Sequence, residues 1–359
     1  MRPTVNDIAR EAGVSLATVD RVLNGRPGVR DKTIRAVNDV IARLGYVRDL
    51  AAANLARSRT YRMAVLVPDT ESQFHQTLVE ALQDAGRVAS VSRVELRILR
   101  FPAEDPHALA ALLGTLPARN FAGLALMAPE TPILRDAVRS LRAKGLPVVA
   151  LVSDLPNTER DHFIGIDSHA AGRTAAVLMG RFLGAGAGQG PAQVMVIGQS
   201  LLARDTIERR RGFDEVLLRD FPQVEALQTL EAHDSALTLR RIVTEMLVNA
   251  PGIRGIYAMG GGQRALTQLI EEMRLSERLV VIGHELTPHT RDALERGQMA
   301  AVITQNVGHL ARSALRVLRA KVDRMPIDES QEQIRIEIVI RENLPDLPDS
   351  VAATAVRAA

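Results

Sequence analysis

From Tyr61 onward the sequence alternates short apolar segments with amphipathic ones, and this alternation limits the fold more than any other feature. Continuous apolar segments predict buried parallel strands, and apolar residues at helical spacing between them predict crossover helices. Roughly ten strands exceed one comfortable doubly wound sheet, so we expect an α/β region of two parallel-sheet lobes. The predicted strands are 62–68, 94–101, 122–129, 147–153, 162–167, 192–198, 225–232, 255–260, 278–285 and 300–305, with an extended segment at 333–340. The predicted helices between them are 74–89, 106–116, 133–144, 170–183, 206–219, 236–249, 263–273, 287–295 and 309–321.

The N-terminal part of the chain has a different pattern, typical of a small all-α unit. Thr4 and Asp7 have the spacing of a capping box, Gly13 ends the first helix, and Ser15 begins the second. Two short helices joined by a tight turn form a helix-turn-helix, whose second helix fits the major groove of DNA. The predicted helices are 5–12, 16–23 and 31–44.

Charge separates this unit from the rest of the chain. Residues 1–62 hold 12 Lys and Arg against 6 Asp and Glu, a net of +6, whereas the remaining 33 against 36 give −3. We therefore expect affinity for a polyanion such as DNA to lie at the N-terminal end. Zero cysteines exclude disulfides and thiolate sites. No apolar run has the length of a membrane span, so we expect a cytoplasmic protein with no membrane partner.

Three sequence phrases, VNDIAREAGVSLATVDRVLNG, GVRDKTIRAV and IARLGYVRDLAAANLA, resemble the lactose-repressor (LacI) family of bacterial transcription regulators. The resemblance implies a set of DNA-binding residues, and Arg21 suits base recognition because a guanidinium can pair bidentately with guanine. Arg21 could also be an ordinary surface charge. Asp20 and Arg30 depart from the family pattern, in which serines are usual. The implied residues are Leu16, Ala17 and Arg21 at base edges, with Thr18, Asn24 and Thr33 near phosphates.

A short Ala-rich segment at 49–57 follows, too short to be a stable isolated helix. In the family this segment is a hinge helix in the minor groove, and Leu55 matches the leucine that is wedged between base pairs. An ordinary linker with Leu55 packed on the next domain is the alternative. The resemblance extends to a regulatory region like the periplasmic sugar-binding proteins, in which the chain crosses between lobes three times.

These expectations give a domain plan. The helix-turn-helix domain is predicted over 1–47, a hinge helix or linker over 48–60, the ligand-binding domain over 61–349 and a disordered tail over 350–359. The N-lobe would contain about 61–166 and 306–333. The C-lobe would contain about 167–304 and 334–345.

Polar residues at predicted strand ends give the candidate ligand site. In open α/β sheets ligands bind at the carboxyl ends of strands. Asp154 and Asp167 lie at the ends of predicted strands, but either could instead cap the loop or helix that follows. By similarity to sugar-binding relatives, one aromatic residue, Phe74, would stack on the ligand, and four polar residues would hydrogen-bond its hydroxyls. The site residues are Phe74, Glu130, Arg209, Glu285 and Gln305.

We expect a dimeric, possibly tetrameric, repressor that binds operator DNA under the control of a small sugar or polyol. We expect no cofactor, no metal and no catalytic activity. Two other functions compete with it. Gly260 to Ala265 match G-x-G-x-x-A between a strand and a helix, with Glu285 ending the next strand, as in NAD(P)-dependent oxidoreductases. The third possibility is a sugar-binding protein without DNA function, which the basic head disfavours.

Overall fold

The computed structural model describes residues 3–23, 25–46, 60–103, 105–184, 192–233 and 235–346. The chain forms two compact units, residues 1–59 and 60–359. The predicted hinge with Leu55, the DNA-contact residue Asn24 and the predicted tail lie outside the described residues. Within the described ranges, every helix is too short or too polar to span a bilayer.

The N-terminal unit contains the three predicted helices. Thr4 and Asp7 form the expected capping box, and the Ser15 hydroxyl accepts the Thr18 N–H at 3.2 Å. Ile8, Val19 and Val37 are fully buried and form a core shared by all three helices. The Arg30 side chain makes no capping hydrogen bond, in line with its departure from the usual serine. The helices are α1 (Val5–Ala12), α2 (Leu16–Leu23) and α3 (Asp31–Leu44).

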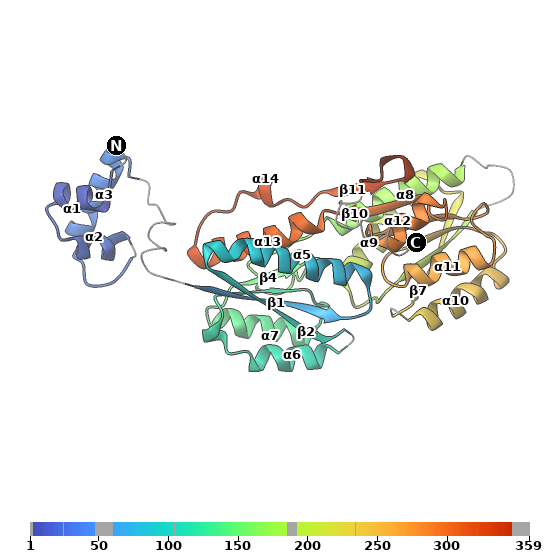
Figure 1. Cartoon of the computed structure of the whole chain (residues 1–359), viewed down its shortest axis with the longest axis horizontal. Coiled ribbons are helices and arrows are strands. Elements are labelled where there is room, and N and C mark those ends of the chain that lie inside the picture. The colour runs from blue at the N-terminus through green and yellow to red at the C-terminus, as the bar shows by residue number, and fades with distance from the viewer. Residues whose placement is uncertain are drawn as a thin grey trace, which may run out of the picture. The chain divides into compact units, whose positions relative to one another are not determined.

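The second unit begins with the N-lobe, a five-stranded sheet in the order β2-β1-β3-β4-β5. All its strand pairs are parallel, as predicted. Figure 1 shows α5 and α13 on one face of this sheet and α6 and α7 on the other. The elements are β1 (Tyr61–Asp69), α5 (Gln73–Ala89), β2 (Val94–Pro102), α6 (Pro106–Thr115), β3 (Gly123–Leu126), α7 (Pro132–Ala143), β4 (Val148–Leu151), β5 (His162–Ile164) and α13 (Val307–Asp323).

The C-lobe is a six-stranded sheet in the order β11-β10-β9-β8-β6-β7. Strands β6 to β10 pair parallel, as predicted, and the extended segment predicted at 333–340 contains an edge strand, β11, that pairs antiparallel with β10. Side chains of α8 and α9 belong to one apolar core, and those of α10 to α12 belong to another. The elements are α8 (Ser168–Gly184), β6 (Ala192–Gly198), α9 (Arg204–Asp220), β7 (Val224–Glu231), α10 (Ala236–Asn249), β8 (Ile253–Ala258), α11 (Gln263–Glu272), β9 (Val280–His284), α12 (Pro288–Glu295), β10 (Ala301–Gln305) and β11 (Ile336–Val339).

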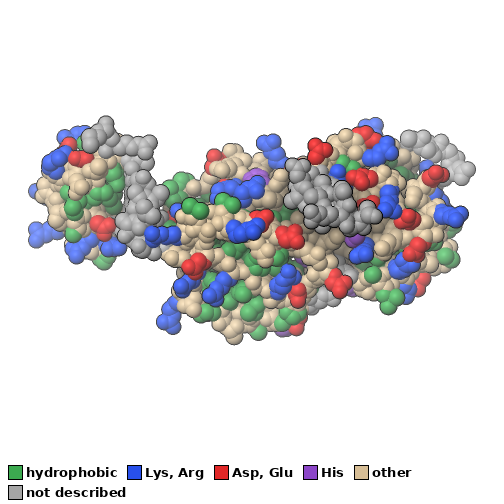
Figure 2. All heavy atoms as spheres, in the orientation of Figure 1, with side chains coloured by type: hydrophobic (Ala, Val, Ile, Leu, Met, Phe, Trp, Pro, Cys, Tyr) green, Lys and Arg blue, Asp and Glu red, His purple; other side chains and the backbone are tan. Residues whose placement is uncertain are grey.

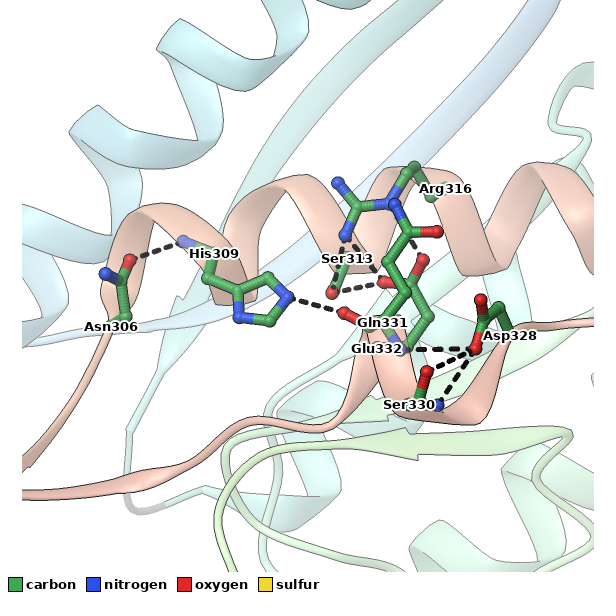
Figure 3. A network of polar contacts seen from close by, with 8 residues as sticks. All are labelled: Asn306, His309, Ser313, Arg316, Asp328, Ser330, Gln331 and Glu332. Carbon is green, nitrogen blue, oxygen red and sulfur yellow. Dashed lines mark hydrogen bonds and ion pairs between the residues drawn. The ribbon is translucent and has the colours of Figure 1, made fainter.

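The chain passes between the lobes after β5, after β10 and before β11, close to the three predicted positions. A short helix that the sequence did not predict, α14 (Glu329–Glu332), ties the two later crossings together (Figure 3). Arg316 of α13 donates to the Glu332 carboxylate at 2.8 and 2.7 Å, and Ser313 donates to the same group. Nε2 of His309 lies 2.8 Å from the Gln331 carbonyl oxygen. These contacts hold the return segment against α13.

Candidate functional site

The second helix of the N-terminal unit presents the predicted DNA-contact residues at its surface. Leu16 is half exposed, and Ala17 and Arg21 are exposed, while Val19 on the opposite side is buried. Thr18 shares a 2.9 Å hydrogen bond with the Ser15 hydroxyl at the start of the helix. Figure 2 shows Lys and Arg side chains over the surface of this unit. One face of α2 is therefore free to contact another molecule.

Asp20, which departs from the family pattern, pairs with an arginine that the sequence did not suggest. Its carboxylate lies 3.4 Å from Nη1 of Arg26, and both side chains are about half exposed. A pair this exposed contributes little to stability. Its effect is to reduce the negative charge that Asp20 adds beside Arg21.

A cavity of about 490 Å³ lies between the two lobes of the second unit. Phe74, Arg209 and Glu285, three of the predicted ligand residues, line it together. Gln305 lies directly behind Glu285 and donates to its Oε1 at 3.0 Å. The structure therefore brings three of the residues chosen by the strand-end rule to the wall of one cavity, and their role toward a ligand stays a prediction.

Arg209 is the most enclosed of these residues, with only 3% of its surface exposed. Its Nη1 donates to the Met259 carbonyl at 2.5 Å, and its guanidinium lies 3.5 Å from Asp205 and 3.6 Å from Glu285. Its Nε is buried and has no hydrogen-bond partner among the described residues. A buried donor without a partner is costly, so a ligand oxygen is the natural acceptor for it.

Close packing of α8 against α9 fixes the position of Arg209. A Cβ on Gly172 would overlap the backbone of Arg209, and a Cβ on Gly212 would overlap the backbone of His169. The two helices thus approach backbone to backbone at two points. This contact sets where the Arg209 side chain leaves α9.

Glu285 is buried at the end of β9 in an unusual conformation. Its φ is 67°, in the left-handed region, and its N–H donates to the Ile303 carbonyl at 2.8 Å. Burial raises the pKa of its carboxyl to about 7, against the smaller lowering effects of Arg209 and Gln305. Its Oε2 lacks a partner among the described residues. Val152, with φ 66°, lines the same cavity, and such strained residues often cluster at ligand sites.

Glu130 lies apart from the residues that line the cavity. Its carboxylate accepts the Asn157 N–H at 3.0 Å and lies 3.9 Å from Nη1 of Arg204, which belongs to the other lobe. The strand was predicted to run to residue 129, whereas β3 ends at Leu126, and the segment that follows carries the Glu130 side chain to the lobe junction. The structure therefore places it in a contact between lobes, and its role toward a ligand stays a prediction.

The two aspartates with alternative roles make local contacts. Asp167 accepts the Ala170 N–H at 2.9 Å at the start of α8, which is a helix cap. Asp154 accepts its neighbour's N–H and pairs with Arg160, whose Nη2 donates at 2.7 Å. His284, which precedes Glu285, is fully buried, and its Nε2 lies 2.8 Å from the Tyr257 hydroxyl.

Several residues that line the cavity were not predicted from the sequence. His75 is buried, and burial lowers its pKa to about 4, so it is neutral at ordinary pH. The Gln73 amide oxygen accepts the His289 N–H at 3.3 Å, directly joining the lobes. Asp205 lies one helical turn before Arg209, a spacing that the sequence does show. Arg264 lies in the first turn of α11.

The glycine motif lies between a strand and a helix, as a dinucleotide fingerprint requires. It connects β8 to α11, and the three strands β9, β10 and β11 follow it. It opens on the cavity between the lobes. The motif is thus part of the same candidate ligand site.

Comparisons with known proteins agree with this arrangement. Residues 63–324 match the family described as periplasmic binding protein domain, and residues 4–49 match the family described as bacterial regulatory proteins, lacI family. The HTH-type transcriptional regulator GntR of Pseudomonas aeruginosa is 27% identical over 350 residues, 95% of this chain and 96% of that protein. Catabolite control protein A of Priestia megaterium is 30% identical over 171 residues, 48% of this chain and 49% of that protein.

Solved structures share the fold of the second unit. A carbohydrate transporter solute binding protein from Agrobacterium radiobacter, in complex with D-arabinose, has a TM-score of 0.71 at 20% identity, covering 82% of this chain and 98% of that chain. A glucose-galactose binding protein from Geobacillus stearothermophilus has a TM-score of 0.71 at 17% identity, covering 80% and 99%. The two family matches, rather than these structures, show that the chain belongs to the lacI family of bacterial regulatory proteins, with the family's N-terminal domain at residues 4–49 and a periplasmic binding protein domain at residues 63–324.

Proposed function

We propose that the protein is a dimeric repressor that binds operator DNA and responds to a small sugar or polyol in the cavity between the lobes. The observation that carries this proposal is that two cavity-lining residues, Arg209 and Glu285, each have a buried polar atom with no hydrogen-bond partner among the described residues. Arg209 Nε is a donor, and Glu285 Oε2 is an acceptor while the carboxyl is ionised. Hydroxyl groups both donate and accept, so neighbouring hydroxyls on one molecule would satisfy both atoms. Phe74 would cover the apolar face of a sugar ring.

The predicted DNA contacts complete the proposal. Leu16, Ala17 and Arg21 would meet base edges, and Thr18 and Thr33 would lie near phosphates. One head reads only a few base pairs, so two heads on a pseudo-palindromic site are needed for specific binding. We expect a homodimer, possibly paired into a tetramer, acting in the cytoplasm where its DNA lies.

Coupling between the cavity and the head would run through α13. This helix begins two residues after Gln305 and ends at Asp323, about 25 Å away along its axis. There the Tyr61 hydroxyl donates to the Asp323 carboxylate at 2.8 and 2.9 Å, and Arg319 lies over the Tyr61 ring. Tyr61 begins β1, where the chain enters the regulatory domain. A movement of one lobe relative to the other at Gln305 would therefore be transmitted by a rigid helix to Tyr61, at the start of the regulatory domain.

A thermal-shift screen of pentoses, hexoses, polyols and inositols tests the ligand class, followed by an operator-binding assay with each hit. We expect a hit to raise the melting temperature and to change affinity for duplex DNA. Arg209→Ala should remove both responses while DNA binding at low salt and a cooperative unfolding transition of the regulatory domain persist, which shows that both units are folded. The exposed Arg241→Ala serves as the matched control. A wild-type protein indifferent to duplex DNA at low salt contradicts the proposal.

The oxidoreductase alternative has its own test. If the glycine motif held a nicotinamide dinucleotide, adding the protein to the reduced cofactor would change the fluorescence of the nicotinamide. We expect that fluorescence to stay unchanged, because both relatives compared above are named as regulators rather than enzymes.

A further inference from the structure

The glycine segment Gly260–Gly262 leaves backbone rather than side chains at one end of the cavity. Gly262 has φ 74°, and it provides no side-chain cap for α11. A Cβ there would lie 2.7 Å from Leu239, so only glycine fits. The first turn of α11, from Gln263 to Ala265, lines the cavity. Its N–H groups thus lack a side-chain acceptor from the cap, and such groups attract anions.

A cation is added at this positive helix end. Arg264 lies in the same first turn and lines the cavity, and within the described part of the chain it forms no ion pair. A positive side chain opposes the helix dipole at an N-terminus. His289 lies on the cavity wall as well, and the charge of Arg264 adds to burial in lowering its pKa. A bound anion would relieve this concentration of positive charge.

A separate observation in the same cavity also requires an acceptor. Arg209 is held by the carbonyl of Met259, the residue just before the glycines, yet its buried Nε has no partner among the described residues. Its two neighbouring acids, Asp205 and Glu285, lie on the guanidinium's other nitrogens. Two acids of the cavity wall thus already face the Arg209 guanidinium, whereas Arg264 in the first turn of α11 has no ion pair among the described residues. Glu71 of the N-lobe is the remaining acid on its wall.

We propose that the effector is a polyol with one anionic end, a carboxylate or a phosphate, held by the first turn of α11 and Arg264. Its hydroxyls face Arg209 and Glu285. This inference rests on the proposed function, and it makes Arg264 the residue that selects acidic over neutral effectors. Carboxylate and phosphate would be recognised by the same groups here, so the experiment must include both to tell them apart.

Calorimetric titration of the full chain with matched ligand sets tests the proposal. Each set contains an aldose, its alditol, its aldonate and its terminal phosphate on one carbon skeleton, for example glucose, glucitol, gluconate and glucose 6-phosphate. We expect one anionic member to bind at least about tenfold more tightly than the neutral members, as a charge-assisted hydrogen bond implies. Added salt should weaken binding of that member and leave neutral binding unchanged. Arg264→Gln should abolish the preference, and Arg241→Gln should keep it.

Three results overturn the inference. In the first, neutral members bind as tightly as anionic ones. In the second, Arg264→Gln keeps the preference for the anionic member. In the third, Arg264→Gln weakens the binding of neutral and anionic members equally. The third result would mean that Arg264 contacts the other lobe when the cavity closes and does not contact the ligand. An equal loss of affinity in Glu71→Gln would identify Glu71 as the residue that it contacts. If neutral polyols bind and alter operator affinity, the proposed function stands and only this inference fails. If no member of any set binds, both fail.

Discussion

Replacing Gly172 with alanine tests whether the contact between α8 and α9 positions Arg209. The new Cβ would lie 2.7 Å from the Arg209 carbonyl carbon and 2.9 Å from its Cα. Carbon atoms in ordinary contact are about 3.5–4.0 Å apart, so the helices must separate by roughly 1 Å. Because these neighbours are backbone atoms, rotation of a side chain cannot relieve the overlap.

The expected cost follows from this displacement. Overpacking of a well-packed contact costs about 1–3 kcal/mol, and for a domain of this size each kcal/mol lowers the melting temperature by about 2 °C. The melting temperature of Gly172→Ala should therefore fall by about 2–6 °C. Moving α9 also disturbs the 2.5 Å hydrogen bond from Arg209 to Met259. A displaced Arg209 makes a poorer charge-assisted hydrogen bond to the ligand, and loss of such a bond lowers affinity by roughly tenfold or more.

Calorimetry of unfolding and titration with an effector measure both quantities. Gly184→Ala is the matched control, because it lies on the same helix and a Cβ there meets nothing within 4 Å. Alanine favours a helix over glycine by up to about 1 kcal/mol, so this control should be neutral or slightly stabilising. If Gly172→Ala keeps wild-type stability and affinity, the helix contact does not position Arg209, and this account of the site is wrong.

Three other predictions concern the cavity, the coupling helix and the head. Since burial raises the pKa of Glu285 to about 7, its contribution to stability is present below the unfolded value of 4.5 and is lost as the pH rises through 7. Wild type should lose about 3 kcal/mol between about pH 5 and about pH 8 relative to Glu285→Gln in urea denaturation, and parallel curves would contradict this. Tyr61→Phe removes the hydroxyl that donates to the Asp323 carboxylate, so an effector should change operator affinity less than in wild type, whereas an unchanged response excludes that route. Arg21→Ala should relax base preference by about 1–3 kcal/mol at one position in competition footprinting, and unchanged footprints would show that Arg21 is only a surface charge.

Most of the element order was predictable because each element is long enough to show its period. The buried strands are continuous apolar segments, and α5 or α10 covers several turns with apolar residues on one side. The helix α14 escaped prediction because four residues do not complete a periodic pattern. The direction of β11 escaped for another reason, since an extended edge strand has the same alternation whether it pairs parallel or antiparallel.

The candidate site was predictable where a side chain directly follows a strand, as Glu285 does. Glu130 also follows a strand, but the course of the loop after β3 carries it to Arg204, and sequence spacing contains no information about that course. Arg264 and His289 lie in the first turns of the helices that follow β8 and β9, several residues beyond the strand ends. A rule that considers only strand ends does not reach them.

Glycines in the C-lobe show most clearly what a sequence leaves open. At Gly172 the space for a side chain is filled by the backbone of Arg209, so the missing side chain serves the packing of two helices. At Gly260 the nearest atom to a Cβ is 3.7 Å away, on Gln199, and the residue lines the cavity. The same residue type thus brings protein backbone together in one place and leaves backbone accessible in the other. Only the second use offers a position to a ligand, and the packing around each glycine distinguishes the two.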